Sequence, residues 1–241
     1  MKSFFLLLLL SSLLGYTTTP LHADHPPSEQ AYVPVTALQR SVVKMLTIRG
    51  NDVGEGSAFF AGAPGQLVTN AHVVDGASHF YVFITAPDGQ SVAIHQAKMK
   101  HMDATHDLAV LEVLGEHLPP AIPLATTDAL LMQEVVSIGY PGDIDEDYAK
   151  SIIAKRLRPG SVFNEPAVLA YLLPHFTKGH IGKMVPGRFY HTAAIDRGNS
   201  GGPLVNKAGE VVGINRSATS DPFYPFYFAI PVQHLRELLV K

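Results

Sequence analysis

Residues 57–85 read SAFFAGAPGQLVTNAHVVDGASHFYVFIT, and this stretch decides the fold class. It holds three short runs that are typical of β-strands, Ser57–Phe60, Gln66–Thr69 and His79–Thr85. Gly, Pro, Asn and Asp separate the runs, as expected for strands joined by tight turns. The stretch therefore predicts an all-β barrel or sandwich rather than a helical protein.

The same pattern continues on both sides of this stretch. Ala86-Pro87-Asp88-Gly89 is a typical hairpin turn between two strands. Further strand-like runs are Val42–Ile48, Val92–Met99, Leu108–Val113, Val135–Ile138, Val211–Ile214 and Phe223–Ile230.

Only the end of the chain has a helical pattern. Pro231 suits a first helical turn, and Val232, Leu235 and Leu238 then recur at helical spacing. We therefore expect a short C-terminal helix over about residues 231–240.

Composition limits the classes of function. The chain of 241 residues is 46% hydrophobic and 16% charged, which fits one globular catalytic domain. A net charge of -3 gives no basic field for nucleic acid or anionic lipid. The sequence has no cysteine, which excludes disulfides, a thiol nucleophile and a thiolate metal site.

The N-terminus resembles a secretory signal. Lys2 precedes an apolar run from Phe4 to Leu14, and Ala23 offers a small residue for cleavage. We expect residues 1–23 to be a signal peptide and residues 24–34 a flexible lead-in. An uncleaved anchor is the alternative, but the run is shorter than the roughly 20 residues that span a bilayer. The prediction is an exported protein, periplasmic or secreted, with no stable membrane anchor after cleavage.

Three residues carry candidate chemistry. Ser200 lies in Asp196-Arg197-Gly198-Asn199-Ser200-Gly201-Gly202-Pro203, where a glycine-rich turn could aim the N–H groups of Gly198 and Ser200 at a developing oxyanion. His72 follows the run Gln66–Thr69 and has the side chain best suited to act as a base at neutral pH. Asp107 precedes the run Leu108–Val113 and could orient that imidazole.

These blocks resemble those of one peptidase family. The blocks Thr69-Asn70-Ala71-His72-Val73-Val74, His106-Asp107-Leu108-Ala109-Val110-Leu111 and Gly198-Asn199-Ser200-Gly201-Gly202-Pro203-Leu204 are similar to the three signature blocks of trypsin-like serine peptidases. The likeness is greatest to bacterial HtrA/Deg proteases and extends over roughly residues 42–239, including Phe228-Ala229-Ile230-Pro231.

The resemblance implies a fold and a mechanism. It implies two six-stranded antiparallel β-barrels in residues 35–241, the first over about 35–120 and the second over about 121–230, divided near Leu118 to Thr127. It also implies that His72 is the general base, Asp107 its orienting acid and Ser200 the nucleophile, with the amides of Gly198 and Ser200 as the oxyanion hole. The expected activity is peptide-bond hydrolysis of protein or peptide substrates through an acyl-enzyme, without cofactor or metal.

The resemblance also suggests a substrate pocket. Ala194 would lie at its base and Tyr227 on its wall, with Asn215 as a third candidate. Because no acid stands at Ala194, we expect a small or medium apolar side chain before the scissile bond.

Two departures from the family pattern stand out. Relatives usually continue into PDZ domains, whereas this sequence ends within the terminal helix, so we expect no PDZ domain. The sequence is least regular from Asp143 to Arg188, which has room for a short helix, and the second departure is its proline-broken part from Asn164 to Arg188. We expect a long irregular loop there, either a lid or specificity loop beside the site or a loop packed against the barrel.

Other readings remain open at this point. Gly198-Asn199-Ser200-Gly201-Gly202 also fits the G-x-S-x-G elbow of α/β-hydrolases, with Asp221 and His234 following, although Gly201-Gly202-Pro203 is a poor helix start. No histidine pair has a spacing typical of metal ligands. A binding protein with a protease fold and an occluded site is the non-enzymatic alternative, and oligomerisation is left open.

Overall fold

A computed structural model describes residues 35–142, 147–218 and 226–240, all within one compact unit, Ala31–Lys241. The predicted signal peptide and lead-in lie outside the described residues. None of the helices in the described ranges is long and apolar enough to cross a membrane.

The first barrel consists of six antiparallel strands in the order β4-β1-β2-β3-β6-β5, closed by the pairing of β4 with β5. Along each strand, successive side chains point alternately into the barrel and out of it. Val43 and Met45 fill the barrel interior, whereas Val42 faces the second barrel. The strands are β1 (Val42–Arg49), β2 (Asp52–Phe60), β3 (Gln66–Thr69), β4 (His79–Thr85), β5 (Val92–Asp103) and β6 (Leu108–Val113).

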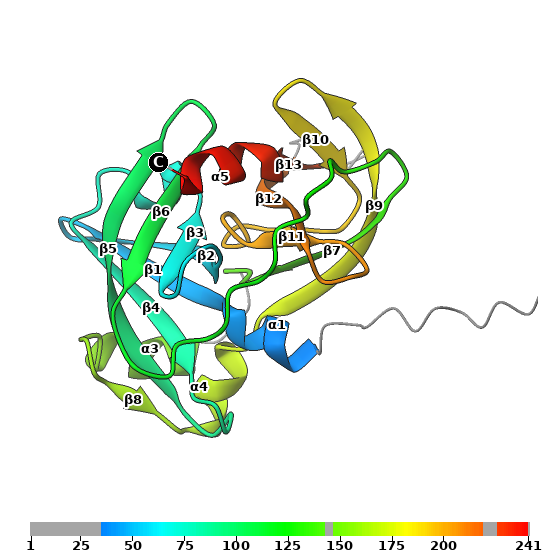
Figure 1. Cartoon of the computed structure of the whole chain (residues 1–241). Coiled ribbons are helices and arrows are strands. Elements are labelled where there is room, and N and C mark those ends of the chain that lie inside the picture. The colour runs from blue at the N-terminus through cyan, green and yellow to red at the C-terminus, as the bar shows by residue number, and fades with distance from the viewer. Residues whose placement is uncertain (1–34, 143–146, 219–225, 241) are drawn as a thin grey trace, which may run out of the picture. The chain divides into compact units, whose positions relative to one another are not determined.

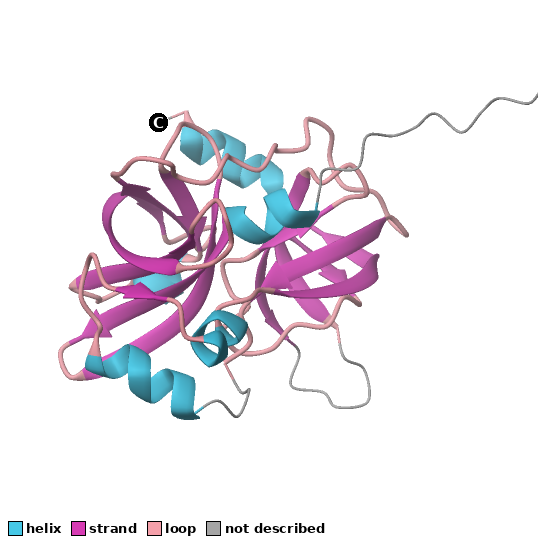
Figure 2. Cartoon of the chain, turned by 90° about the horizontal axis from the view of Figure 1, so that it is seen from below, coloured by secondary structure: helices cyan, strands magenta, loops and turns pink. Residues whose placement is uncertain are grey.

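The second barrel closes in the order β10-β13-β12-β11-β7-β9. Its interior is filled by side chains that include Val135, Ile181, Phe189 and Leu204. The strands are β7 (Glu134–Gly139), β9 (His175–Val185), β10 (Arg188–His191), β11 (Pro203–Val205), β12 (Val211–Ala218) and β13 (Tyr227–Pro231). Figure 2 shows the strands of the two barrels as two neighbouring groups.

A shared apolar core joins the barrels. Phe59 of the first barrel packs in one cluster with Ile138 and Ile214 of the second. Helix α1 (Val35–Ser41) adds Leu38 to this cluster, and helix α5 (Val232–Leu239) adds Leu235. The site described below lies where these barrels meet.

An excursion between β7 and β9 covers the outside of the first barrel. It contains α3 (Asp147–Lys155), β8 (Val162–Phe163) and α4 (Pro166–Tyr171), and Figure 1 shows all three beside β4 and β5. β8 pairs with β5 through Val92 and Phe163, so chain from the second half extends the first sheet. Ile153 and Val168 bury their side chains in the cluster beneath the excursion.

The predicted fold class is confirmed, with two closed six-stranded antiparallel barrels and a short C-terminal helix. The prediction of an irregular loop from Asn164 to Arg188 is wrong for most of that range, because β9 begins at His175 and pairs regularly with β7. Only Gly179 and Ile181 of β9 are buried, so the strand carries no apolar run. The irregular excursion instead ends before His175.

Candidate active site

His72 and Asp107 come from neighbouring strand ends of the first barrel. Helix α2 (Ala71–Val74) follows β3 directly, and Asp107 immediately precedes β6, which pairs with β3. His72 Nδ1 lies 2.8 Å from Asp107 Oδ2 and 3.1 Å from Oδ1, and the His72 backbone N–H donates to Oδ1 at 2.9 Å. Because a carboxylate only accepts, Nδ1 carries the proton and Nε2 is left as an acceptor. This arrangement makes His72 Nε2 available as a base.

Asp107 is held from several directions. Its backbone has a positive φ of 55°, in the left-handed region that aspartate tolerates better than most residues. Its carbonyl accepts a hydrogen bond from Asn70 Nδ2 at 3.0 Å, and its Oδ2 accepts one from Arg216 Nε at 2.7 Å. Burial by itself raises the pKa of Asp107, but hydrogen bonds from His72 and Arg216 outweigh it and hold the pKa below its usual range. Asp107 is therefore ionised at neutral pH.

Arg49 fixes the short helix that carries His72. Arg49 Nε donates to the carbonyl of Asp75 at 2.8 Å, and its NH2 group donates to the carbonyls of Val73 at 2.6 Å and His72 at 3.2 Å. These carbonyls lie at the end of α2, where intrahelical partners are lacking. Sequence reasoning missed Arg49, because Arg49-Gly50-Asn51-Asp52 reads only as a turn.

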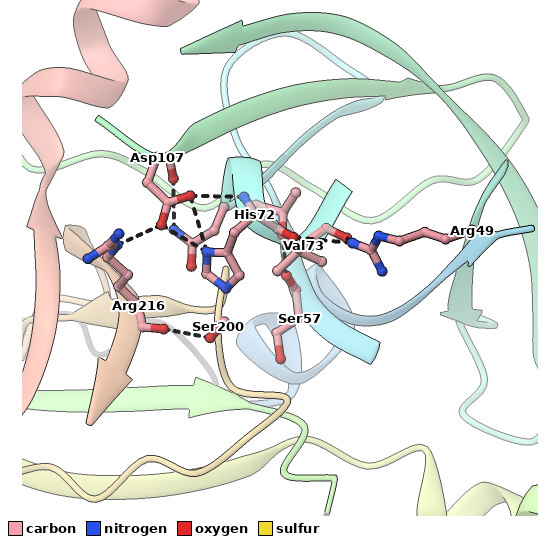
Figure 3. A network of polar contacts seen from close by, with 9 residues as sticks. Arg49, Ser57, His72, Val73, Asp107, Ser200 and Arg216 are labelled. Atoms are coloured by element: carbon pink, nitrogen blue, oxygen red, sulfur yellow. Dashed lines mark hydrogen bonds and ion pairs between the residues drawn. The ribbon is translucent and has the colours of Figure 1, made fainter. Parts of the chain in front are cut away.

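Ser200 lies on the loop between β10 and β11 of the second barrel. Its carbonyl accepts the backbone N–H of Ser57 in β2 at 2.9 Å, so the first barrel anchors the loop. Its hydroxyl donates to the carbonyl of Arg216 at 2.6 Å, and no hydrogen bond among the described residues joins it to His72. Figure 3 shows the His72 ring between Asp107 and Ser200. The structure thus brings the three residues together, with the Ser200 hydroxyl turned toward β12.

The N–H of Gly198 and the carbonyl of Arg197 belong to one peptide bond and point in opposite directions. The carbonyl of Arg197 accepts a hydrogen bond from the N–H of Gly142 at 2.7 Å. In a planar trans peptide, C=O and N–H point in opposite directions, so the Gly198 N–H points away from Gly142. Within the described ranges neither this amide nor that of Ser200 has an acceptor. Both N–H groups are therefore left without a hydrogen-bond partner in this part of the structure.

Gly198 must be glycine at this place. Its φ is 91°, and a Cβ there would lie 2.3 Å from the carbonyl oxygen of Tyr140. The hydroxyl of Ser57 donates to the Gly198 carbonyl at 2.7 Å and accepts the Tyr140 N–H at 2.9 Å. Ser57 therefore holds the loop of Gly198 and Ser200 from the first barrel, a contact that sequence reasoning missed.

A cavity of about 550 Å³ opens beside these groups, and we call it the catalytic cavity. His72, Gly198 and Ser200 line it on one side. Gly142 and Val53 lie among its other walls. Its volume is in the range of ligand and substrate sites.

The three residues predicted for the substrate pocket lie elsewhere. None of Ala194, Asn215 and Tyr227 lines the catalytic cavity. Asn215 is fully buried, and its amide donates to Ser137 Oγ at 2.8 Å, so its side chain is directed into the second barrel instead of a pocket. This differs from the expectation for Asn215.

The other two remain nearer the surface. The exposed Ala194 accepts the hydroxyl of Thr177 at 2.5 Å through its carbonyl. The Tyr227 ring lies 5.9 Å from the ring of His191. Residues 219–225, between β12 and β13, lie outside the described residues, so the pocket itself stays a prediction.

Comparisons with known proteins find related sequences and structures. The family model described as "Trypsin-like peptidase domain" matches residues 56–214. The chain is 36% identical over 182 residues to the putative serine protease HhoB of Synechocystis, covering 75% of the chain and 38% of that protein. It is 32% identical to the mitochondrial serine protease HTRA2 of Bos taurus, covering 78% of the chain and 36% of that protein. A probable periplasmic serine endoprotease DegP-like of Pseudomonas savastanoi is 36% identical, covering 73% of the chain and 32% of that protein.

The chain therefore spans 32% to 38% of the length of these three relatives. Among solved structures, the serine endoprotease of Yersinia pestis superposes with a TM-score of 0.66 at 24% identity, over 86% of this chain and 64% of that one. The active form of the Rv3671c protease of M. tuberculosis gives a TM-score of 0.65 at 25% identity, over 96% of this chain and 94% of that one.

Proposed function

Since the chain belongs to the family of trypsin-like peptidases, we propose that it is a serine endopeptidase in which His72, Asp107 and Ser200 form the catalytic triad. The observation that carries the proposal is the double contact between His72 and Asp107, through the ring at 2.8 Å and the backbone at 2.9 Å. This pair lies beside a cavity that both His72 and Ser200 line. Likeness to proteins named HtrA-type or DegP-like endoproteases adds support.

In the proposed first step, the Ser200 hydroxyl turns from the Arg216 carbonyl toward His72 Nε2. Side-chain rotations of this kind take picoseconds to nanoseconds, so the turn adds little to the barrier. His72 takes the proton while Ser200 Oγ attacks the peptide carbonyl. The amides of Gly198 and Ser200 then bind the oxyanion, and each such donor contributes about 3 to 4 kcal/mol to lowering the barrier.

The tetrahedral intermediate then breaks down. His72 gives its proton to the leaving amine, the C–N bond breaks, and the acyl group stays on Ser200. A water molecule repeats the attack with His72 again as base, which releases the acid and restores Ser200. Throughout, the ionised Asp107 stabilises the imidazolium form of His72 and keeps its ring in place.

We further propose an exported enzyme, periplasmic or secreted, that acts on protein or peptide substrates without a cofactor. The apolar N-terminal sequence supports export, and DegP-like relatives are named periplasmic. Near Ala194 and Tyr227 we expect a small or medium apolar side chain before the scissile bond. Cleavage of a mixed peptide library tests this, and predominant cutting after Arg or Lys would contradict it.

One observation favours a second candidate, a binding protein with a protease fold. The Ser200 hydroxyl donates to Arg216 rather than to His72, and the Arg216 guanidinium shares the Asp107 carboxylate with the imidazole. A protein locked in this arrangement would have a nucleophile without a base.

Labelling with a fluorophosphonate probe separates the two candidates. A competent Ser200 reacts with the probe, and Ser200→Ala abolishes the reaction while leaving the fold intact. If the purified protein takes up no label across pH 5 to 9, the enzyme proposal is wrong and the binding protein is favoured.

A further inference from the structure

A second cavity lies next to the catalytic cavity, between the excursion and the first barrel. It measures about 200 Å³, and we call it the α3–α4 cavity. Its apolar walls include Leu46, Val53 and Phe83 from the barrel and Ile153, Leu157 and Tyr171 from the excursion. An apolar cavity of about 150 Å³ is enough to accommodate a benzene ring. The α3–α4 cavity therefore has room for one aliphatic or aromatic side chain.

The two cavities share lining residues. Val53 and Glu55 of β2 line both. Lys150 of α3 lines the α3–α4 cavity and donates through Nζ to the carbonyl of Gly142 at 3.2 Å, while Gly142 lines the catalytic cavity. A polypeptide that leaves the catalytic cavity past Val53 would therefore meet the α3–α4 cavity next.

We call the route past Val53 from the catalytic cavity to the α3–α4 cavity the passage. Its position indicates which part of the substrate, before or after the scissile bond, would enter it. The part of a substrate before the scissile bond stays attached to Ser200, and the proposed pocket for it lies around Ala194 and Tyr227, outside the catalytic cavity. The catalytic cavity instead extends from Ser200 past His72, which protonates the leaving amine, toward Arg49 and Val53. Figure 3 shows Arg216 and Arg49 on opposite sides of His72. The passage thus lies on the leaving-group side.

Two of the three charged residues that line the α3–α4 cavity, Lys44 and Glu55, are paired with each other, and the third, Lys150, donates to the carbonyl of Gly142. Lys44 is 2% exposed and its Nζ lies 2.7 Å from Glu55 Oε2. The same ammonium group lies 4.7 Å from the centroid of the Tyr171 ring. Since the buried cation has both a carboxylate and an aromatic face, a charged occupant would disturb a balanced pair. The chemistry favours an apolar occupant.

We propose that the α3–α4 cavity is a specificity subsite that binds an apolar side chain, of leucine or phenylalanine size, two or three residues after the scissile bond. This inference rests on the proposed endopeptidase function. It assigns the excursion a role in substrate selection, because the excursion supplies half of the residues that line the cavity.

The test uses quenched fluorescent peptides that share one sequence before the scissile bond. They carry Leu or Ser at the first, second or third residue after it. We expect Leu at the second or third position to raise kcat/KM about tenfold or more over Ser, the size of discrimination that an apolar pocket supplies. At the first position the exchange should have little effect.

Two variants of α3 locate the effect. Ala154 lines the cavity from an exposed helix position, so Ala154→Trp fills the cavity without disturbing the core. Lys155→Trp adds the same side chain to the next exposed position, which does not line the cavity. Ala154→Trp should remove the preference for Leu, and Lys155→Trp should keep it.

An activated ester without a leaving peptide separates the failure of this inference from the failure of the endopeptidase proposal. Both variants should hydrolyse the ester and label with fluorophosphonate at the wild-type rate. If the wild type cleaves peptides but shows no preference, or if Ala154→Trp keeps the preference, the subsite is wrong. If no peptide is cleaved and no label is taken up, the endopeptidase proposal has failed instead.

Discussion

The two barrels contribute unequal halves of the candidate site. The first barrel holds His72 and Asp107 by contacts within itself, through the Nδ1 and backbone hydrogen bonds and through Arg49. The second barrel holds Ser200 on a loop that depends on the first barrel, because Ser57 binds the carbonyls of both Ser200 and Gly198. Most contacts of His72 and Asp107 thus lie within the first barrel, although Arg216 of the second barrel also binds Asp107. The loop of Gly198 and Ser200 is bonded both within the second barrel and, through Ser57, across the interface between the barrels.

This difference indicates which substitutions should affect each part of the site. Asp107→Asn and Arg216→Gln should act on the His72 and Asp107 pair, whereas Ser57→Ala should act on the loop of Ser200. His191→Phe tests the stability of the second barrel.

The largest effect is expected for Asp107→Asn. An amide in place of the carboxylate favours the wrong His72 tautomer and cannot stabilise the imidazolium, so kcat should fall about 10⁴-fold. Peptide hydrolysis under saturating substrate measures it. Asp103→Asn is the matched control, because Asp103 pairs with His106 at 2.8 Å in the same turn and stays outside the proposed triad. Retention of more than a tenth of the wild-type kcat in Asp107→Asn would contradict the role of Asp107.

The next effect concerns the stability of the second barrel in acid. Burial lowers the pKa of His191 in β10 to about 4. Between pH 4 and about 6.5 the unfolded chain binds the proton and the folded chain does not, so the free energy of unfolding falls as the pH is lowered. The loss should reach about 3 kcal/mol at pH 4.

His191→Phe removes this titrating group and should flatten the dependence on pH. Urea unfolding at pH 7, 5.5 and 4 measures it, and the exposed residue His180 of β9 supplies the control variant His180→Phe. An unchanged pH slope in His191→Phe would show that acid sensitivity arises elsewhere.

A smaller effect is expected for Ser57→Ala, which removes the clamp on the Gly198 carbonyl. The oxyanion amides should then be less well placed, and kcat should fall about tenfold with little change in KM, less than the loss of a donor itself. Ser41→Ala is the control, because the buried hydroxyl of Ser41 also donates to a backbone carbonyl, that of Pro120 at 2.7 Å, away from the site. Equal loss in both variants would reduce Ser57 to a structural role.

The smallest effect is expected for Arg216→Gln. Arg216 helps to hold the pKa of Asp107 below its usual range, so its loss raises that pKa and the ionised form disappears at a higher pH. Arg216 is 46% exposed, so solvent screens its charge and the upward shift of the acid limb of fluorophosphonate labelling should be small. A downward shift would contradict the sign.

Much of the fold could be predicted, because most strands are short apolar runs bounded by turn residues. β3, β4 and β6 have the predicted bounds. Strands without such runs could not be found from pattern alone. β9 contains Gly179, where a Cβ would lie 2.1 Å from the backbone nitrogen of Ala193, so close approach to a neighbouring segment dictates its sequence.

The candidate triad could be proposed from sequence blocks, but its supports could not. Ser57, Arg49 and Arg216 act largely on backbone carbonyls or through contacts between barrels, and such contacts leave no local pattern. The α3–α4 cavity could not be predicted either, because its lining residues, such as Glu55 and Tyr171, are far apart in the sequence.

The core between the barrels has a consequence for synthesis. Val42 near the start of the domain and Leu235 in α5 belong to the same cluster, so this core cannot close before residues 232–239 have been made. Until then the loop of Ser200, which the first barrel holds through Ser57, lacks its complete support. Under the proposed function, the active site is therefore complete only after α5 has been synthesised, which limits premature proteolysis during translation.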